Sequence, residues 1–231
     1  MGLACVPDEH CHGCRTSSMG LACVPDDHCH GRGISRLGLA SILEYGKELG
    51  IGRVAPGEGM IKAPYGPKSW NKVSTLMIDG SRLYGEVLDT MFFQTMKKLQ
   101  VLAIFNPRFR SLPSFLFENT DLRLLVLRGC DQLENIDQIK HLEKLIVLEI
   151  SGASSLKNNL PDEFFQNMQQ LESLNLSAVP FQSLPSSLSK LTKLRRLILK
   201  ECSKLEELPN IEAFTELEVV DLSGSTSLKK N

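Results

Sequence analysis

The sequence lacks three features that would set it apart from ordinary globular proteins. No uninterrupted apolar run approaches the roughly 18 to 20 residues that a transmembrane helix needs. The net charge is only -1, from 26 Lys and Arg against 27 Asp and Glu, so charge gives no general reason to bind nucleic acid or an anionic membrane. The first nine residues, MGLACVPDE, lack the basic start of a secretory signal. We therefore expect a cytoplasmic chain whose seven cysteines are reduced thiols.

Residues 1–33 form a leader that is rich in cysteine and histidine. The string MGLACVPDEHCHGC at residues 1–14 recurs almost unchanged at residues 19–32. Thiolates and imidazoles are the usual zinc ligands, so a zinc site is one interpretation. However, His10-Cys11-His12 does not form the paired ligand hooks of a zinc finger, and Arg32 replaces Cys14 in the second copy. We predict a duplicated, poorly ordered leader without a metal.

Residues 34–72 are predicted to hold a short helix that starts near Ile34, followed by a connector rich in glycine and proline. Two fragments of this segment are similar to nucleotide-binding motifs. GIGRVA at residues 50–55 fits a dinucleotide fingerprint, but a helical pattern precedes it where the fingerprint needs a strand. GPKS at residues 66–69 separates its lysine from the glycine that a P-loop places directly before it. We therefore predict no nucleotide cofactor.

From Val73 onward, one apolar pattern, L-x-x-L-x-L, recurs in seven units. Consecutive units start 26, 23, 23, 26, 23 and 23 residues apart. This spacing lies within the leucine-rich-repeat period of roughly 20 to 29 residues, and seven units in register are not a chance pattern. The units begin at Val73, Leu99, Leu122, Leu145, Leu171, Leu194 and Leu217.

The spacing inside each unit predicts the fold. Residues two apart share one face of a strand, so the leucines of L-x-L point inward and the residues between them point to the opposite, concave face. The returning half carries Leu-Pro pairs, in which each proline disfavours a helix at the residue before it. We predict an α/β leucine-rich-repeat solenoid over residues 73–231, with a concave parallel β-sheet and an irregular or 3₁₀ convex side. Small or thiol residues where the chain turns inward are predicted to be packing residues: Cys130, Ala153, Cys202 and Ser225.

The Leu-Pro pairs and the cysteines in Leu127-Arg128-Gly129-Cys130 and Leu199-Lys200-Glu201-Cys202 resemble the repeats of plant intracellular disease-resistance receptors. These are the nucleotide-binding, leucine-rich-repeat (NLR) proteins. GEGMIKAP at residues 57–64 and WNKVSTLM at residues 70–77 resemble that family's junction before the first repeat. The resemblance covers residues 34–231 and implies the repeat portion without a nucleotide-binding domain, because no P-loop is found. It also implies a protein partner: a pathogen effector, a guarded host protein, or a nucleotide-binding domain that the repeats restrain in cis or in trans.

Partner contacts are predicted on the concave face, where strand side chains do not enter the core. Val101, Leu124 and Val147 align there as an apolar column, which suggests a protein contact. The alternative is that another domain of the same receptor covers this column and that the charges on the face are simply solvated. The predicted contact residues are Phe105, Leu124, Val126, Arg128, Val147, Glu149, Asn175, Arg196, Ile198, Lys200 and Asp221.

No catalytic constellation emerges from the repeats, so we predict that the chain is not an enzyme. Their single histidine, His141, lies in a returning segment without an implied serine or cysteine partner. A second functional hypothesis is a stand-alone repeat scaffold of the kind that links kinases or small GTPases. The junction at Trp70–Met77 argues against it, because a free-standing scaffold has no reason to carry that segment.

Overall fold

The computed structural model describes residues 74–79, 96–112, 114–118, 120–157, 159–208 and 210–229. The expectations for the leader at 1–33 and for the helix and connector at 34–72 lie outside these residues. So do Pro113 and Pro209, the prolines of two of the Leu-Pro pairs.

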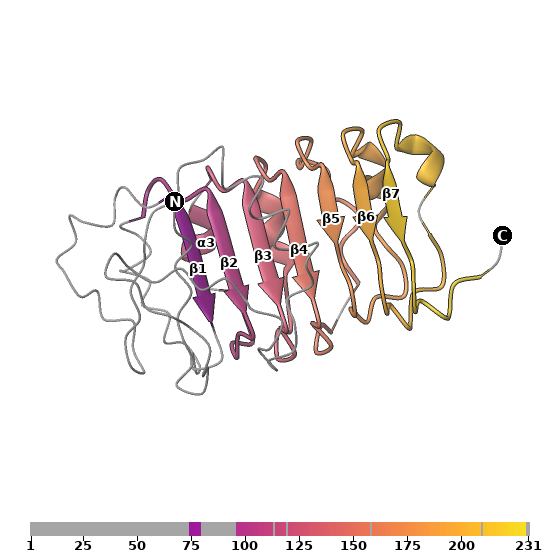
Figure 1. Ribbon diagram of the computed structural model, residues 1–231, viewed down its shortest axis with the longest axis horizontal. Helices are drawn as coiled ribbons and strands as arrows, with labels where there is room; N and C mark the ends of the chain where they lie inside the picture. The colour runs from indigo at the N-terminus through magenta and orange to yellow at the C-terminus, as the bar shows by residue number, and fades with distance from the viewer. Residues whose placement is uncertain are drawn as a thin grey trace, which may run out of the picture.

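Seven parallel strands form one sheet in which each strand lies beside its neighbours in sequence (Figure 1). No strand crosses over another, because each repeat adds one strand to the growing edge. The predicted parallel sheet is therefore confirmed. The strands are β1 (Thr75–Asp79), β2 (Val101–Phe105), β3 (Leu124–Arg128), β4 (Val147–Ser151), β5 (Ser173–Asn175), β6 (Arg196–Ile198) and β7 (Val219–Asp221).

The strand register places equivalent residues of successive units side by side. The central leucine of each unit pairs with the next, from Leu76 in β1 to Leu197 in β6, and these side chains are at most 1% exposed. Successive strand side chains point to opposite faces, so this column and the leucines two residues later fill the core. The inward direction predicted for the L-x-L leucines is confirmed. At β7 the column ends in Val220, which is 43% exposed.

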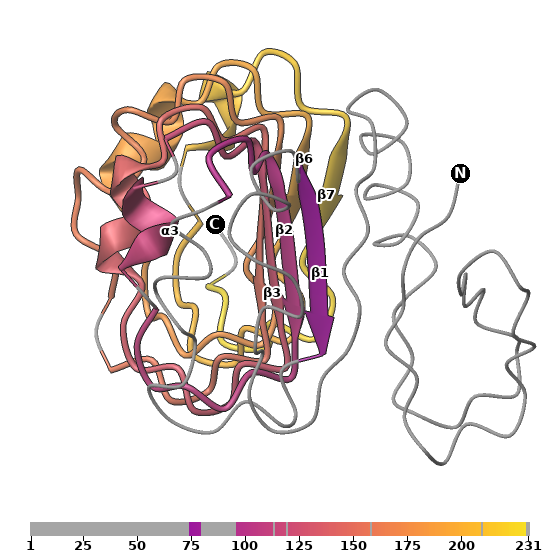
Figure 2. The ribbon, with the colours of Figure 1, turned by 90° about the vertical axis from the view of Figure 1, so that its left-hand side faces the viewer.

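Short helical turns form the side of the solenoid that faces away from the sheet. Figure 2 shows the strands along one side and the returning segments, with α3, along the other. Pro185 has φ -64° and ψ 146° and directly precedes η4, which fits its fixed φ and missing N–H. The helical elements are α3 (Phe115–Glu118), η3 (Asp137–His141), η4 (Ser186–Lys190) and η5 (Ile211–Ala213). In the part of the chain that the structure describes, no helix has the length and apolar character to cross a membrane.

A left-handed residue follows each of the strands β2–β7 and reverses the chain. In the units of β2–β6 its backbone N–H donates to a carbonyl of the following unit, for example from Gly152 to Ser177 at 3.0 Å and from Ala178 to Lys200 at 2.7 Å. These bonds extend the sheet ladder by one residue at the same edge. The positions with positive φ are Asn106, Gly129, Gly152, Ala178, Glu201 and Gly224.

The next residue turns into the core and ties neighbouring repeats together. Cys130 and Ala153 are 0% exposed, Cys202 is 1% exposed and Ser225 is 9% exposed, which confirms their predicted packing position. The Ser225 hydroxyl donates to the Leu199 carbonyl at 2.6 Å and accepts from the Cys202 N–H at 3.0 Å. The Cys202 thiol donates to the Leu176 carbonyl at 2.9 Å. In these two successive units, the thiol and the hydroxyl therefore each bind a backbone carbonyl of the preceding unit.

Candidate protein-interaction face

The concave face is formed by the strand side chains that alternate with the core leucines. Rows of such side chains cross the sheet, because the register aligns the first and third positions of all seven strands and the fifth positions of β1–β4. The face divides into two halves of different chemistry. We call the part over β1–β4 the apolar half and the part over β5–β7 the polar half.

The apolar half is a second hydrophobic cluster on the opposite side of the sheet from the core. Its members are at most 4% exposed: Val101, Ala103, Leu124, Val126 and Val147. Met77, Phe105 and Ile146 are partly buried against them. We expected Leu124, Val126 and Val147 to be free to contact a partner, whereas the structure buries them. Strand alternation predicts which face a side chain occupies, but not whether that face is covered.

Thr75 carries an unsatisfied hydroxyl at the edge of this half. The residue is 5% exposed, and its Oγ1 has no hydrogen-bond partner in the structure. Burying a hydroxyl without a partner costs free energy, of the order of 1 to 3 kcal/mol in proteins. Thr75 is aligned in register with Val101, so this polar atom borders the apolar cluster.

Arg128 and Glu149 form a bidentate ion pair at the boundary between the halves. The Arg128 Nε donates to Glu149 Oε1, and Arg128 Nη2 donates to Glu149 Oε2 at 2.8 Å. The two side chains are only 13% and 10% exposed. A guanidinium fork matches a carboxylate in this way, so each charge is neutralised by the other.

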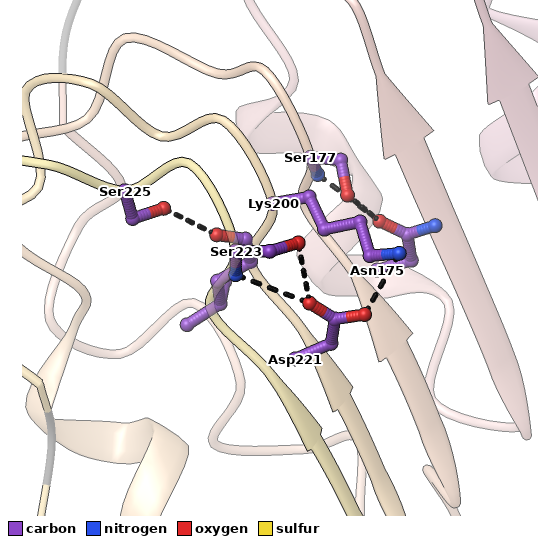
Figure 3. A network of polar contacts seen from close by, with 7 residues as sticks. Asn175, Ser177, Lys200, Asp221, Ser223 and Ser225 are labelled. Atoms are coloured by element: carbon purple, nitrogen blue, oxygen red, sulfur yellow. Dashed lines mark hydrogen bonds and ion pairs between the residues drawn. The ribbon is translucent and has the colours of Figure 1, made fainter.

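The polar half repeats one turn motif in two units (Figure 3). Asn175 Oδ1 accepts from the Ser177 N–H at 3.1 Å and from the Ser177 hydroxyl at 2.6 Å. Asp221 Oδ1 accepts from Ser223 in the same two ways, at 3.1 and 2.7 Å. In each case the side chain of the last strand residue fixes the backbone that leaves the strand.

The second oxygen of Asp221 accepts from Lys200 Nζ at 2.7 Å. The hydrogen bond from Lys200 and the two bonds from Ser223 lower the pKa of the Asp221 carboxyl to about 2. All three contacts favour the ionised carboxylate, and they outweigh the slight desolvation. The charge of Lys200 is therefore already paired with Asp221 of β7.

Arg196 and Ile198 complete the polar half from β6, and both are half-buried. Arg196 lies between Ser173 and Val219 in register, so neither neighbour offers it a carboxylate. The Arg196 backbone N–H donates to the Glu172 carbonyl at 3.0 Å, whereas its guanidinium has no hydrogen bond or ion pair within the described residues. The adjacent Arg195 differs, because it pairs with Glu216 at 3.3 Å and Glu218 at 3.6 Å.

The structure thus brings the predicted contact residues onto one face but gives them different roles. Leu124, Val126 and Val147 are buried. Five of the others are half-buried on this face: Phe105, Asn175, Arg196, Ile198 and Asp221. The neutralisation of Arg128 and Lys200 by acids of the next strand was not predicted from the sequence. In both pairs the acid follows the base by 21 residues in the sequence, which was a signal that could have predicted them. The strand register shows why this spacing brings the two side chains onto neighbouring strands. Partner binding by these residues stays a prediction.

The thiols and the histidine of the repeats show no catalytic arrangement. Burial raises the pKa of the Cys130 thiol far above its usual range, and burial also raises that of Cys202. Both therefore remain protonated and weakly nucleophilic. His141 is exposed at the end of η3, as expected. Among the described residues, no group of three or more His, Cys, Asp or Glu side chains is placed to hold a metal ion.

A family described as leucine-rich repeat region matches residues 96–231, which is more than half of the chain. The chain belongs to the leucine-rich repeat family. This membership agrees with the parallel sheet, the 3₁₀ turns and the buried residue after each strand.

Proteins named as disease resistance proteins are similar to most of the chain, which confirms the resemblance of its repeats. Arabidopsis thaliana At4g19050 is 41% identical over 185 residues, covering 79% of this chain and 15% of that protein. Arabidopsis thaliana At5g45510 is 40% identical over 184 residues, covering 79% and 15%. Disease resistance protein RPS6 of the same plant is 32% identical over 142 residues, covering 61% and 12%. The chain spans less than a sixth of the length of these relatives.

Two solved structures are similar to part of the chain. Internalin C2 of Listeria monocytogenes has a TM-score of 0.44 at 16% identity, covering 68% of this chain and 84% of that chain. The leucine-rich-repeat ectodomain of the receptor kinase GASSHO1/SCHENGEN3 of Arabidopsis thaliana has a TM-score of 0.41 at 20% identity, covering 68% and 25%.

Proposed function

We propose that this chain is the protein-recognition module of a plant immune receptor and acts in the cytoplasm. Its concave face binds a pathogen effector or a guarded host protein. In the resting state the same repeats restrain a nucleotide-binding domain, in cis or in trans. The similarity to disease resistance proteins over 79% of the chain supports the immune role.

The observation that carries this proposal is the division of the concave face. A buried apolar half offers a contact that is already committed to packing, whereas the polar half leaves side chains accessible to a second protein. Interfaces combine apolar contact with polar side chains that fix orientation, and the polar half has both, since half-buried Ile198 lies beside Asn175 in register. The fixed register holds these side chains in place before a partner arrives, which reduces the entropy lost on binding.

The test is to co-express the full chain in leaves with a panel of cloned pathogen effectors and candidate host proteins, followed by co-immunoprecipitation. Arg196→Glu should abolish capture of a partner with little change in thermal unfolding, because the Arg196 side chain makes no hydrogen bond or ion pair within the described residues and its backbone bond is kept. Lys193→Glu is the matched control: it reverses the same charge at an exposed lysine whose Nζ donates to Gln170 Oε1 at 2.7 Å. Equal capture by both variants would contradict binding through the concave face. Capture of kinases or small GTPases alone would support the scaffold hypothesis instead.

A further inference from the structure

We infer that residues 34–43 of this chain, ISRLGLASIL, pack on the concave face and cover the apolar half. The inference goes beyond the proposed function, because it concerns a contact within the chain and not the recognition of a second protein. It starts from the burial of the apolar half, which the strands and the returning segments do not explain by themselves.

A comparison of two equivalent positions shows that neighbouring strands alone do not bury a concave side chain. Val126 and Ile198 are the third residues of β3 and β6, and each lies between two paired strands. Val126 is 1% exposed, whereas Ile198 is half-buried. In Figure 2 the returning segments that the structure describes lie on the core side of the strands. The described part of the chain therefore places no element over Val126, and its cover comes from another part.

The cover lies at the β1 end of the sheet. β1 and β7 each pair with a single strand, so their concave side chains should be exposed to a similar degree. Thr75 is nonetheless only 5% exposed, whereas the equivalent Val219 is half-buried. Along this row the side chains are buried from β1 to β4 and half-buried from β5 to β7. Residues 1–73 join the described fold at Ser74, directly before β1, and therefore enter at the covered end.

The other long segment beside β1, residues 80–95, is assigned to a returning segment by its sequence. FFQTM at residues 92–96 matches FFQNM at residues 164–168, and each string ends three residues before the first leucine of the next unit. Phe164, Phe165 and Met168 are buried in the core, and so is Met96. Residues 80–95 therefore belong to the core side of the first unit, which leaves residues 1–73 for the cover.

Within residues 1–73, the segment 34–43 has the highest density of large aliphatic side chains. The helix predicted from its spacing would be about 15 Å long for ten residues. Three strand spacings of about 4.8 Å separate β1 from β4, a span of about 14 Å. A helix laid across the strands would thus cover the apolar half and leave the polar half open. Its aliphatic residues are Ile34, Leu37, Leu39, Ile42 and Leu43.

Photocross-linking of the full chain tests this contact. Phe105 is half-buried against the apolar cluster, so Phe105→p-benzoylphenylalanine places a photoreactive aromatic ring there with little change of shape. After irradiation of the monomeric protein and digestion with trypsin, mass spectrometry should find the peptide of residues 99–108 joined to that of residues 37–47. Ile198→p-benzoylphenylalanine is the matched control in the polar half and should not give a cross-link to residues 37–47.

A second pair of variants checks that the contact is apolar. Leu39→Asp with Ile42→Asp, added to the Phe105 variant, should lower the cross-link yield at least about tenfold, because a carboxylate loses its hydration in an apolar contact. Fluorescence of anilinonaphthalene sulfonate should rise as the apolar half is uncovered. Val6→Asp with Val24→Asp is the matched control, since it places the same two charges in the leader, and it should change neither signal. Circular dichroism verifies that the repeats stay folded.

The remaining outcomes contradict the inference in different ways. A cross-link from position 105 to residues 1–33, 44–73 or 80–95 would assign the cover to another segment. A cross-link between two chains, seen as a dimer after denaturing electrophoresis, would identify a second copy as the occupant. An absence of cross-links at position 105, or a yield unchanged by Leu39→Asp with Ile42→Asp, would also overturn it. None of these results bears on partner capture through Arg196, so the proposed function is tested separately.

Discussion

At the scale of single residues, the turn after each strand carries backbone strain in two units. Ala178 has φ 53° and Glu201 has φ 55°, where three other units place glycine. A left-handed conformation brings the Cβ of an ordinary residue close to its own backbone and costs roughly 1 kcal/mol or more. These two units keep the turn because its N–H is bound to the next repeat.

Replacing Ala178 by glycine should therefore stabilise the protein. We expect Ala178→Gly to raise the free energy of unfolding by about 1 kcal/mol, measured by urea denaturation. Gly152→Ala is the mirror control and should lower it by about the same amount. Its added Cβ would lie 3.4 Å from Gly129 Cα, an ordinary contact, so the effect would come from the backbone alone. A lower free energy of unfolding in Ala178→Gly would contradict the interpretation that Ala178 is strained.

Asp221 gives a pH-dependent contribution at the same scale. Its pKa falls from 3.8 to about 2 on folding, so the unfolded chain takes up the proton first as the pH drops. The stabilisation is therefore complete above about pH 4 and is lost as the pH falls through 2. Asp221→Asn keeps the acceptor for Ser223 but loses the charge. We expect it to be less stable than the natural protein at pH 7, with the difference vanishing near pH 2. A difference that is independent of pH would contradict this linkage.

At the scale of elements, the Arg128–Glu149 pair joins β3 and β4 beside an apolar cluster. Glu149→Ala would leave a mostly buried guanidinium without its partner, at a cost of about 2 to 4 kcal/mol. Replacing both residues, Arg128→Met with Glu149→Leu, should recover most of that loss, because the apolar half can accept two more apolar side chains. Equilibrium denaturation of Glu149→Ala and of the double variant measures how much stability the double replacement recovers. Equal losses of unfolding free energy in these two variants would contradict the prediction.

The strands could be predicted from sequence because their signal is local and repeated. Leucines two apart, such as Leu125 and Leu127, determine both the strand and its inward face. The ion pairs could not be predicted from the sequence, because the register between two units is needed to show that Arg128 lies near Glu149. The burial of Leu124 also escaped prediction, since alternation names a face without saying what covers it. Ala178 carries no turn signal of its own and is recognised only by its alignment with glycines in other units.

At the scale of the whole molecule, each repeat contacts mainly its neighbours, so stability should behave as a sum of units and interfaces. Deleting residues 194–216 removes one unit of 23 residues and joins β5 to the unit of β7 in register. We expect this variant to fold with a lower denaturant m-value, because less surface is exposed on unfolding. Circular dichroism and urea unfolding test it, with deletion of residues 194–213 as the out-of-register control. If both deletions unfold the protein, the units are not independent.

Two lengths of unit coexist in the sheet without disturbing it. Thr75 and Val101 are separated by 26 residues, and so are Val147 and Ser173, yet both strand pairs keep the same register as the units of 23. Between β4 and β5, the extra residues lie in the returning segment. Heritable insertions of this size can therefore accumulate on the far side of the protein while the concave face changes only by substitution. Gene duplication and recombination between such units would exchange whole rows of contact residues without requiring the fold to be re-established.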